Sequence, residues 1–302
     1  MSGLRMMTAL WGTSAMETFK RGCLKSLMWD KNKSCLQGAT WDFYTKDEHV
    51  EELEQLVWNN FDVKFDPHIL PDLRDQSGQS APPQYVLHRP MQEQMVACLN
   101  HQAKMLLIPP DTIFGEGTIA NILKIGAQPG TCVAVPHVRV TPQFLDSVSE
   151  TPMSNPKMVD LAWSHMHKSW TQAKAGVSDT NSFWSGVYWQ ELGDKLYSVQ
   201  HRVPTIYLAS FLGEDHVYWQ EQSKFGSWDH RWPGECLIRQ QRQRLPGSSD
   251  ACMIVEITDV DKNVPPLTPD QAKHPFEHDR FWIDTLHAQM NRQYPTIFRG
   301  EA

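Results

Sequence analysis

Apolar and polar residues are arranged along the first half of the chain with two different spacings. Apolar runs of the kind found in strands occupy residues 6–10, 41–44, 105–108 and 131–140. Between them, apolar residues recur at helical spacing over residues 15–29, 46–60, 89–104 and 118–125. Pro90 suits the first turn of the third of these helices. Strands that alternate with helices in this way predict an α/β fold with a mostly parallel sheet flanked by helices.

The second half of the chain has a less regular pattern. Residues 155–170 predict a helix, and short strand-like runs follow from residue 183 onward. Residues 278–294 predict a closing helix. In the first half, the polar segment 71–84 is rich in turn residues and predicts a long surface loop. The second half is therefore expected to be an elaborated α+β arrangement.

Length and composition limit the class of protein. A chain of 302 residues, 40% of them hydrophobic, can form one substantial core, so we expect residues 1–150 and 151–302 to be two halves of the same globular domain. The net charge of −7 disfavours a broad electrostatic surface for nucleic acid, although a local basic patch would still serve one. No apolar run is long enough for a membrane span, and the six cysteines lack paired spacing. These features predict a cytoplasmic protein with reduced thiols.

Two carboxylates follow the strand predicted at 105–108. Asp111 comes after two prolines, and Glu116 lies between Gly115 and Gly117. Ligands of α/β sheets bind beyond the carboxyl ends of the strands, so we expect Asp111 to face that crevice. In one interpretation, Asp111 and Glu116 supply oxygen ligands to Mg²⁺ or Mn²⁺ beside a diphosphate. In the other, Asp111 caps a turn and Glu116 precedes the next helix.

Several short motifs occur in a characteristic order. The segments ALWGTSAMETFKRGCLKSLM, WDFYTKDEHVEELEQL and MLLIPPDTIFGEG give a strand ending in Trp-Gly, a strand ending in Thr, and a strand ending in Pro-Asp with an acid-Gly pair further on. Together they resemble the nucleotide-binding half of GT-A-type glycosyltransferase-like proteins. The segments NPKMVDLAWSHMHKSW and FGSWDHRWPGECLIRQ are similar to later elements of those proteins. The resemblance covers most of residues 6–260, but the plain Asp-x-Asp of the general pattern is absent.

The resemblance implies a GT-A-like sheet in which residues 1–150 bind a nucleotide-sugar, with UDP as the expected nucleotide, and residues 151–302 form the acceptor side. His165 and His167 would point about 200° apart on a regular helix, so one is expected to pack and His167 to contact the ligand. The expected donor-binding residues are Thr8, Trp11, Gly12, Thr45, Asp111, Glu116, Gly117 and His167, with Asp111 and Glu116 also the expected metal ligands.

Asp229 and His230 lie in a turn between Trp228 and Trp232. Asp229 would be the general base that deprotonates an acceptor hydroxyl in an inverting enzyme, with His230 in support and the tryptophans stacking on the ligand. An Asx-type turn over packed tryptophans is the structural alternative.

These observations lead to one main functional expectation and one alternative. The chain is expected to be a glycosyltransferase, a hexosyltransferase that moves a sugar from a nucleotide donor to a hydroxyl acceptor, either a glycan or a hydroxylated nucleobase in DNA. A G-x-S-x-G elbow, a P-loop and a G-x-G-x-x-G are all absent, which counts against hydrolase, ATP and dinucleotide chemistry. The alternative is a non-catalytic carbohydrate- or nucleic-acid-binding protein that uses some of its 12 tryptophans as platforms.

Overall fold

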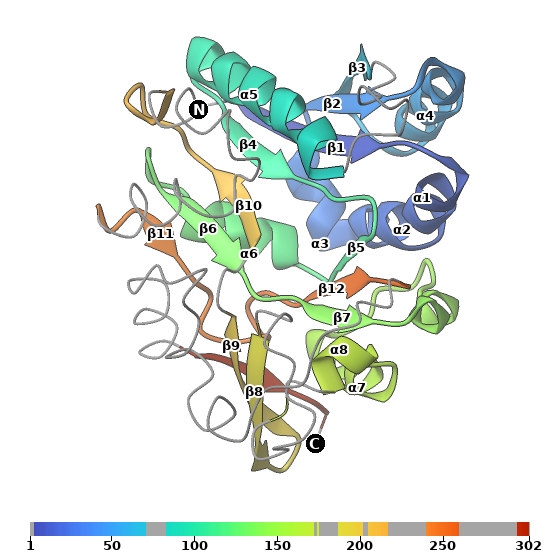
Figure 1. Ribbon diagram of the computed structural model, residues 1–302, viewed down its shortest axis with the longest axis vertical. Coiled ribbons are helices and arrows are strands. Elements are labelled where there is room, and N and C mark those ends of the chain that lie inside the picture. The colour runs from blue at the N-terminus through green and yellow to red at the C-terminus, as the bar shows by residue number, and fades with distance from the viewer. Residues whose placement is uncertain are drawn as a thin grey trace, which may run out of the picture.

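A seven-stranded sheet forms the centre of the fold (Figure 1). The computed structural model describes residues 3–70, 83–171, 174, 187–201, 205–216, 240–259 and 295–301. The strand order is β11-β6-β10-β4-β1-β2-β3. In this sheet β10 runs antiparallel to both its neighbours, and the other pairings are parallel, which confirms the mostly parallel sheet. The bounds are β1 (Leu4–Leu10), β2 (Thr40–Thr45), β3 (Lys64–Ile69), β4 (Lys104–Leu107), β6 (Cys132–Val135), β10 (Thr205–Ala209) and β11 (Gln243–Arg244).

Helices cover both faces of this sheet because residues on each strand alternate between the two faces. On β1, Met6 and Leu10 join a hydrophobic cluster with the helices before β2 and with α4 and α6. Met7 and Ala9 point the other way and join a cluster with Met91, Met95 and Cys98 of α5. Figure 1 shows α5 lying over this part of the sheet. The helices are α1 (Thr13–Thr18), the π turn η1 (Phe19–Cys23), α2 (Leu24–Met28), α3 (Asp30–Lys33), the 3₁₀ turn η2 (Ser34–Leu36), α4 (Asp47–Asn60), α5 (Pro83–His101) and α6 (Thr118–Ile125).

Two smaller sheets complete the fold: one joins β5 and β7 from residues 1–150 to β12 from residues 151–302, and the strands of the other all come from residues 151–302. One is mixed, with the order β5-β12-β7, and the other is antiparallel, with the order β13-β9-β8. They share a hydrophobic cluster with α7 and α8. The bounds are β5 (Thr112–Phe114), β7 (Val138–Val140), η3 (Pro142–Ser147), α7 (Asn155–Ser164), α8 (Lys168–Thr171), β8 (Val187–Gly193), β9 (Leu196–His201), β12 (Ile254–Ile257) and β13 (Thr296–Arg299).

The run predicted as one strand over 131–140 is two strands in different sheets. β6 ends at Val135 in the large sheet, and β7 starts at Val138 in the mixed sheet. Pro136 lies at the break, where its missing N–H removes a ladder hydrogen bond. The prediction of a single strand was therefore wrong, and the break leaves His137 at the carboxyl end of β6.

Two helix predictions also need correction. The helix expected over 89–104 begins at Pro83, so Pro90 lies inside α5 rather than in its first turn. The helix expected over 155–170 is interrupted after Ser164, because the backbone that follows pairs with β7 instead. Thr141 N–H donates to the His165 carbonyl at 2.9 Å, and His167 N–H donates to the Arg139 carbonyl at 2.9 Å. His165 and His167 are therefore not on one regular helix.

Other predicted elements were missed or cannot be compared. The sequence patterns did not indicate β3, β5 or β13 as strands. Residues 71–82 of the predicted surface loop and the closing helix at 278–294 lie outside the described residues. In the described part of the chain, no helix is both long enough and apolar enough to cross a membrane.

Candidate functional site

The large sheet has a topological switch point between β1 and β4. From β1 the chain order runs outward through β2 and β3 in one direction, and β4 lies on the other side. In open α/β sheets, ligands bind beyond the carboxyl ends of the strands at such a point. Here β1 leads into Trp11 and Gly12, and β4 leads into Pro109, Pro110 and Asp111. The left-handed φ of 85° at Gly12 lets the chain turn directly from the strand into α1.

Titratable side chains from three parts of the sequence meet beside this point. Asp111 follows β4, and His137 follows β6. Glu256 on β12 is in register with Arg139 on β7. The Glu256 carboxylate forms ion pairs with His137 Nε2 at 2.6 Å and with Arg139 Nε at 2.9 Å. We call these residues, with His201, the acid–histidine cluster.

Burial makes the charges of the acid–histidine cluster depend strongly on one another. Burial, and next the negative charge of Glu256, raises the pKa of Asp111 from 3.8 to about 7. Burial also acts to raise the pKa of Glu256, but attraction by His137 and Arg139 outweighs it and holds that pKa well below its usual range. Burial, reinforced by the His137 and Arg139 charges, lowers the pKa of His201, so its ring is neutral.

The cluster can interact with phosphate or a divalent cation through different members. Arg139 and His137 carry the donors that bind anionic oxygens. Asp111 makes no ion pair with the described residues, whereas Glu256 already has two partners. A hard cation is commonly held by one or two carboxylates together with substrate oxygens, and Asp111 fits that kind of site. A cation there would also favour the ionised form of a carboxyl that burial otherwise disfavours.

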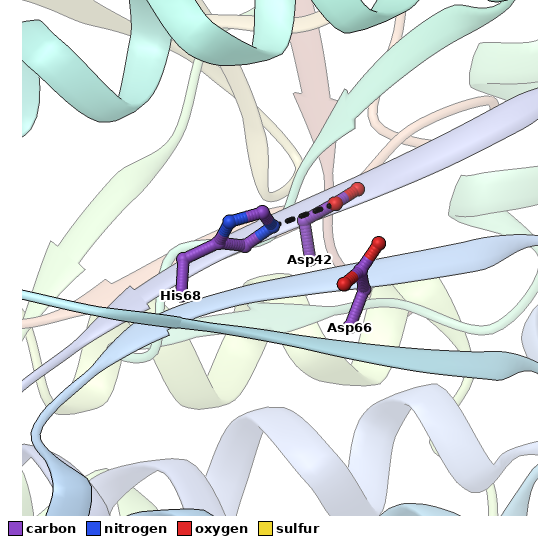
Figure 2. Close-up of side chains that lie close together, drawn as sticks. All are labelled: Asp42, Asp66 and His68. Carbon is purple, nitrogen blue, oxygen red and sulfur yellow. Dashed lines mark hydrogen bonds and ion pairs between the residues drawn. The ribbon is translucent and has the colours of Figure 1, made fainter.

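A second group of polar residues lies on β2 and β3, on the sheet face covered by α5 (Figure 2). Potential ligand atoms of Asp42, Asp66 and His68 all lie within 4.8 Å of one another, so this group could hold a metal ion. His68 Nε2 is 3.1 Å from Asp42 Oδ1. Asp42 precedes the carboxyl end of β2 by three residues, so this group is set back from the strand ends at the switch point.

Arg5 already supplies positive charge to this second group. Its guanidinium forms an ion pair with Asp42 and lies 3.5 Å from Asp66 Oδ2. The Asp42 side chain is fully buried, and its Oδ2 atom has no hydrogen-bond partner. A metal ion would therefore compete with the Arg5 guanidinium for the same carboxylates. The group is most simply an ion-pair network that joins β1, β2 and β3.

Comparisons with known proteins identify no family for the chain. No family model matches, and no curated protein matches. Among solved structures, the chain is similar to S. aureus TarS (10% identity, TM-score 0.31, 50% of this chain and 23% of TarS) and to TarS 1–349 in complex with UDP-GlcNAc (10% identity, TM-score 0.29, 51% and 38%). It is also similar to a putative glucose-1-phosphate thymidylyltransferase from Bacillus anthracis (11% identity, TM-score 0.39, 81% and 86%).

This chain thus spans less than half the length of the TarS chains with which it aligns. With TM-scores below 0.5, these similarities establish no activity for it.

Several residues predicted to bind the donor lie at the carboxyl ends of β1 and β2. Thr8 is buried, donates from Oγ1 to the Ile108 carbonyl at 2.9 Å and accepts from Trp41 Nε1 at 2.9 Å. This bonding ties β1 to β4 and to β2. Thr45 ends β2 with a buried Oγ1 that has no hydrogen-bond partner. An unpaired buried hydroxyl is costly, which makes the Thr45 side chain a candidate ligand contact at a strand end.

Glu116 and Asp111 lie at opposite ends of β5. Glu116 Oε1 accepts from the Lys31 backbone N–H at 3.1 Å, near the start of α3, so this carboxylate faces the positive end of a helix. Gly117 has a left-handed φ of 77° and precedes α6. The joint role of Asp111 and Glu116 as ligands of one metal ion stays a prediction.

His167 is buried, with its Nδ1 2.8 Å from Ser169 Oγ. Its backbone lies beside Arg139, and its role in donor binding stays a prediction. Asp229 and His230 lie outside the described residues.

His137, Arg139 and Glu256 were not singled out as candidate residues in the sequence. A signal for His137 was present, since Pro136-His137 after an apolar run repeats the Pro-Asp arrangement after β4. Glu256 gave no comparable signal, because it sits within an apolar strand whose partners are more than a hundred residues away.

Proposed function

We propose that this chain is a nucleotide-sugar-dependent glycosyltransferase whose donor lies across the carboxyl ends of β1 and β4. The observation that carries the proposal is the meeting of Asp111 with the His137–Glu256–Arg139 ion pairs beside the switch point. Such a site offers both positive donors for a diphosphate and a carboxyl poised near neutral pH. The motif resemblance, which ends its third strand at Asp111, agrees with this location.

The chain's own residues have separate roles in this proposal. Arg139 and His137 bind the diphosphate oxygens as the bond between the sugar anomeric carbon and the diphosphate breaks. The acceptor oxygen forms the new bond to that carbon, and its proton passes to a general base, for which Asp229 is the sequence-based candidate. Where Mg²⁺ or Mn²⁺ takes part, Asp111 would hold it, with Glu116 as the predicted second ligand, and the ion would neutralise the leaving diphosphate.

The nucleotide end of the donor is assigned to the strand ends on the β2 side. Thr45 contributes an unpaired hydroxyl there, and Trp11 and Gly12 border the start of α1. The expected acceptor, a glycan or a hydroxylated base, approaches from the second half of the chain.

Burial of the described tryptophans favours an enzyme over a protein with many aromatic platforms. Trp29, Trp41, Trp170 and Trp189 are buried in the hydrophobic clusters. In the described ranges, Trp58 is the tryptophan with a largely exposed side chain.

Calorimetry with UDP, UDP-glucose and UDP-GlcNAc, with and without Mn²⁺, tests the proposal. We expect wild type to bind at least one of these donors. Arg139→Met should weaken binding by about tenfold or more, the size of one lost charged contact, and Asp111→Asn should do the same when Mn²⁺ is present, because Asp111 contacts the donor through the ion. Asp194→Asn is the control, because Asp194 is an exposed turn residue with a positive φ of 48° that asparagine tolerates. Equal donor binding by Asp111→Asn and wild type in the presence of Mn²⁺, or by Arg139→Met and wild type, would contradict the assignment of the site.

A further inference from the structure

A pocket beside the exposed indole of Trp58 lies near the amino ends of β2 and β3, whereas the switch point lies at the carboxyl ends of β1 and β4. α4 starts just after the carboxyl end of β2 and returns to the amino ends of the strands, where Trp58 lies in its last turn. Residues 59–63 of the pocket lead directly into β3, and Gln37 shortly precedes β2. This pocket is therefore separate from the acid–histidine cluster.

Trp58 is unusual among the described tryptophans because 65% of its surface is exposed. A single exposed aromatic residue is common on protein surfaces, but Trp58 lines a concave site, where its flat indole can stack on a ligand. The pocket has a volume of about 400 Å³, within the range of small-molecule sites.

The polar residues around Trp58 identify the chemistry of the ligand. Gln37 and Asn59 bring amides, which both donate and accept hydrogen bonds, and Asp62 brings an acceptor. Hydroxyl groups of a sugar also donate and accept, and the apolar face of a sugar ring matches a flat indole. A nucleic acid would instead require several cations for its phosphates, but here Lys33 is accompanied by Asp62, so the local charges balance.

The floor of the pocket is held rigidly. Phe61 is buried against Trp41, with ring centroids 5.4 Å apart, and Lys33 Nζ lies 5.9 Å from the Phe61 ring centroid. The Asp62 carbonyl accepts from Gly38 N–H at 2.8 Å, which fixes the loop between α4 and β3. A preformed floor reduces the entropy lost on binding.

We propose that this pocket is an accessory binding site for a neutral saccharide chain, with Trp58 as the stacking platform. The site is independent of the proposed donor site, so it can bind a glycan whether or not the chain transfers sugars.

The test uses the full chain, without nucleotide, and three probes: cellopentaose, maltopentaose and chitopentaose. Saturation-transfer NMR detects binding, and calorimetry gives the affinity. We expect at least one probe to bind, Trp58→Ala to weaken it by about tenfold, and Trp58→Tyr to retain part of the affinity because a smaller aromatic ring remains. Gln37→Ala is expected to weaken binding less.

Two control variants distinguish this pocket from non-specific apolar contact and from the proposed donor site. Leu192→Ala removes another exposed apolar residue, on β8, whose exposed fraction is 52%, and should leave saccharide binding unchanged. Asp111→Asn should also leave it unchanged, so a failure of the donor-site proposal does not affect this result. The inference is overturned if none of the probes binds, or if a folded Trp58→Ala variant binds as wild type does. It is equally overturned if Trp58→Ala instead abolishes self-association or binding to an oligonucleotide.

Discussion

Replacing Asp111 with asparagine should stabilise the folded protein at neutral and alkaline pH while it weakens donor binding. Burial and the charge of Glu256 raise the pKa of Asp111 from 3.8 to about 7, so the ionised form is unfavourable in the folded state. That difference corresponds to about 4 kcal/mol. Asp111 is only half-buried, and water can reach a charged group at such a position, so we expect about 1–3 kcal/mol in the free energy of unfolding.

The sign of the pH dependence follows from proton binding. The folded state binds the Asp111 proton more tightly than the unfolded state does, so the stability of wild type falls as pH rises from 3.8 to about 7. Asparagine cannot ionise, so the advantage of Asp111→Asn grows over this window and is constant above it. Glu256 has a lowered pKa, so its contribution makes stability rise with pH. Both proteins contain Glu256, so this contribution largely cancels in the difference between their free energies of unfolding.

Urea unfolding at several pH values, with a chelator present to exclude metal binding, measures this difference. Asp194→Asn should track wild type at every pH, since that side chain lies in an exposed turn. An Asp111→Asn protein that is less stable than wild type at alkaline pH would refute the burial argument. An advantage that does not change with pH would refute it as well. A variant that gains stability and loses donor binding is the pattern expected of a residue kept for function.

Three further predictions concern the rest of the fold. Arg5→Met should lower the free energy of unfolding by about 3–5 kcal/mol, because it leaves the buried Asp42 carboxylate without its main cation; an unchanged urea midpoint would contradict this. The hydrogen bond to Asp42 raises the pKa of His68 above 6.5, so the contribution of His68 to stability is present below pH 6.5 and is lost as pH rises through the raised value. His68→Asn should remove this pH dependence of the free energy of unfolding, and identical pH profiles for the variant and wild type would disprove the prediction. Gly117→Ala should lower the free energy of unfolding by about 1 kcal/mol because φ at Gly117 is 77°, whereas Gly213→Ala, where the added methyl group meets open space, should lower it less. Equal losses of thermal stability in the two variants would show that backbone strain at Gly117 is unimportant.

Local sequence patterns were sufficient where an element's stability comes from its own residues. The helix predicted at 118–125 matches α6, because Ile119 and Ile122 form an inward stripe and Gly117 and Gly126 border it. The helix predicted through His165 and His167 failed because pairing with β7 replaced helical hydrogen bonds after Ser164. That pairing is a tertiary interaction, which helical spacing does not report.

The strand β3 is the converse case: its own residues did not predict a strand, but the tertiary structure forms one. Its residues alternate between polar and apolar, but it contains Pro67, which weakens any strand prediction. It still forms, because β2 supplies a parallel neighbour and proline is tolerated at the edge of a sheet.

By itself, the sequence determined the alternation of strands and helices, the mostly parallel sheet and the place of Asp111 beyond the carboxyl end of β4. These depend on side-chain periodicity and on the short-range effects of proline and glycine. Only the tertiary structure decided that Asp111 lies beside Glu256, with His137 and Arg139 neutralising the latter. Residues 111 and 256 meet because β5 and β12 pair across more than a hundred residues, and such long-range pairing is set by how the whole chain buries its apolar surface.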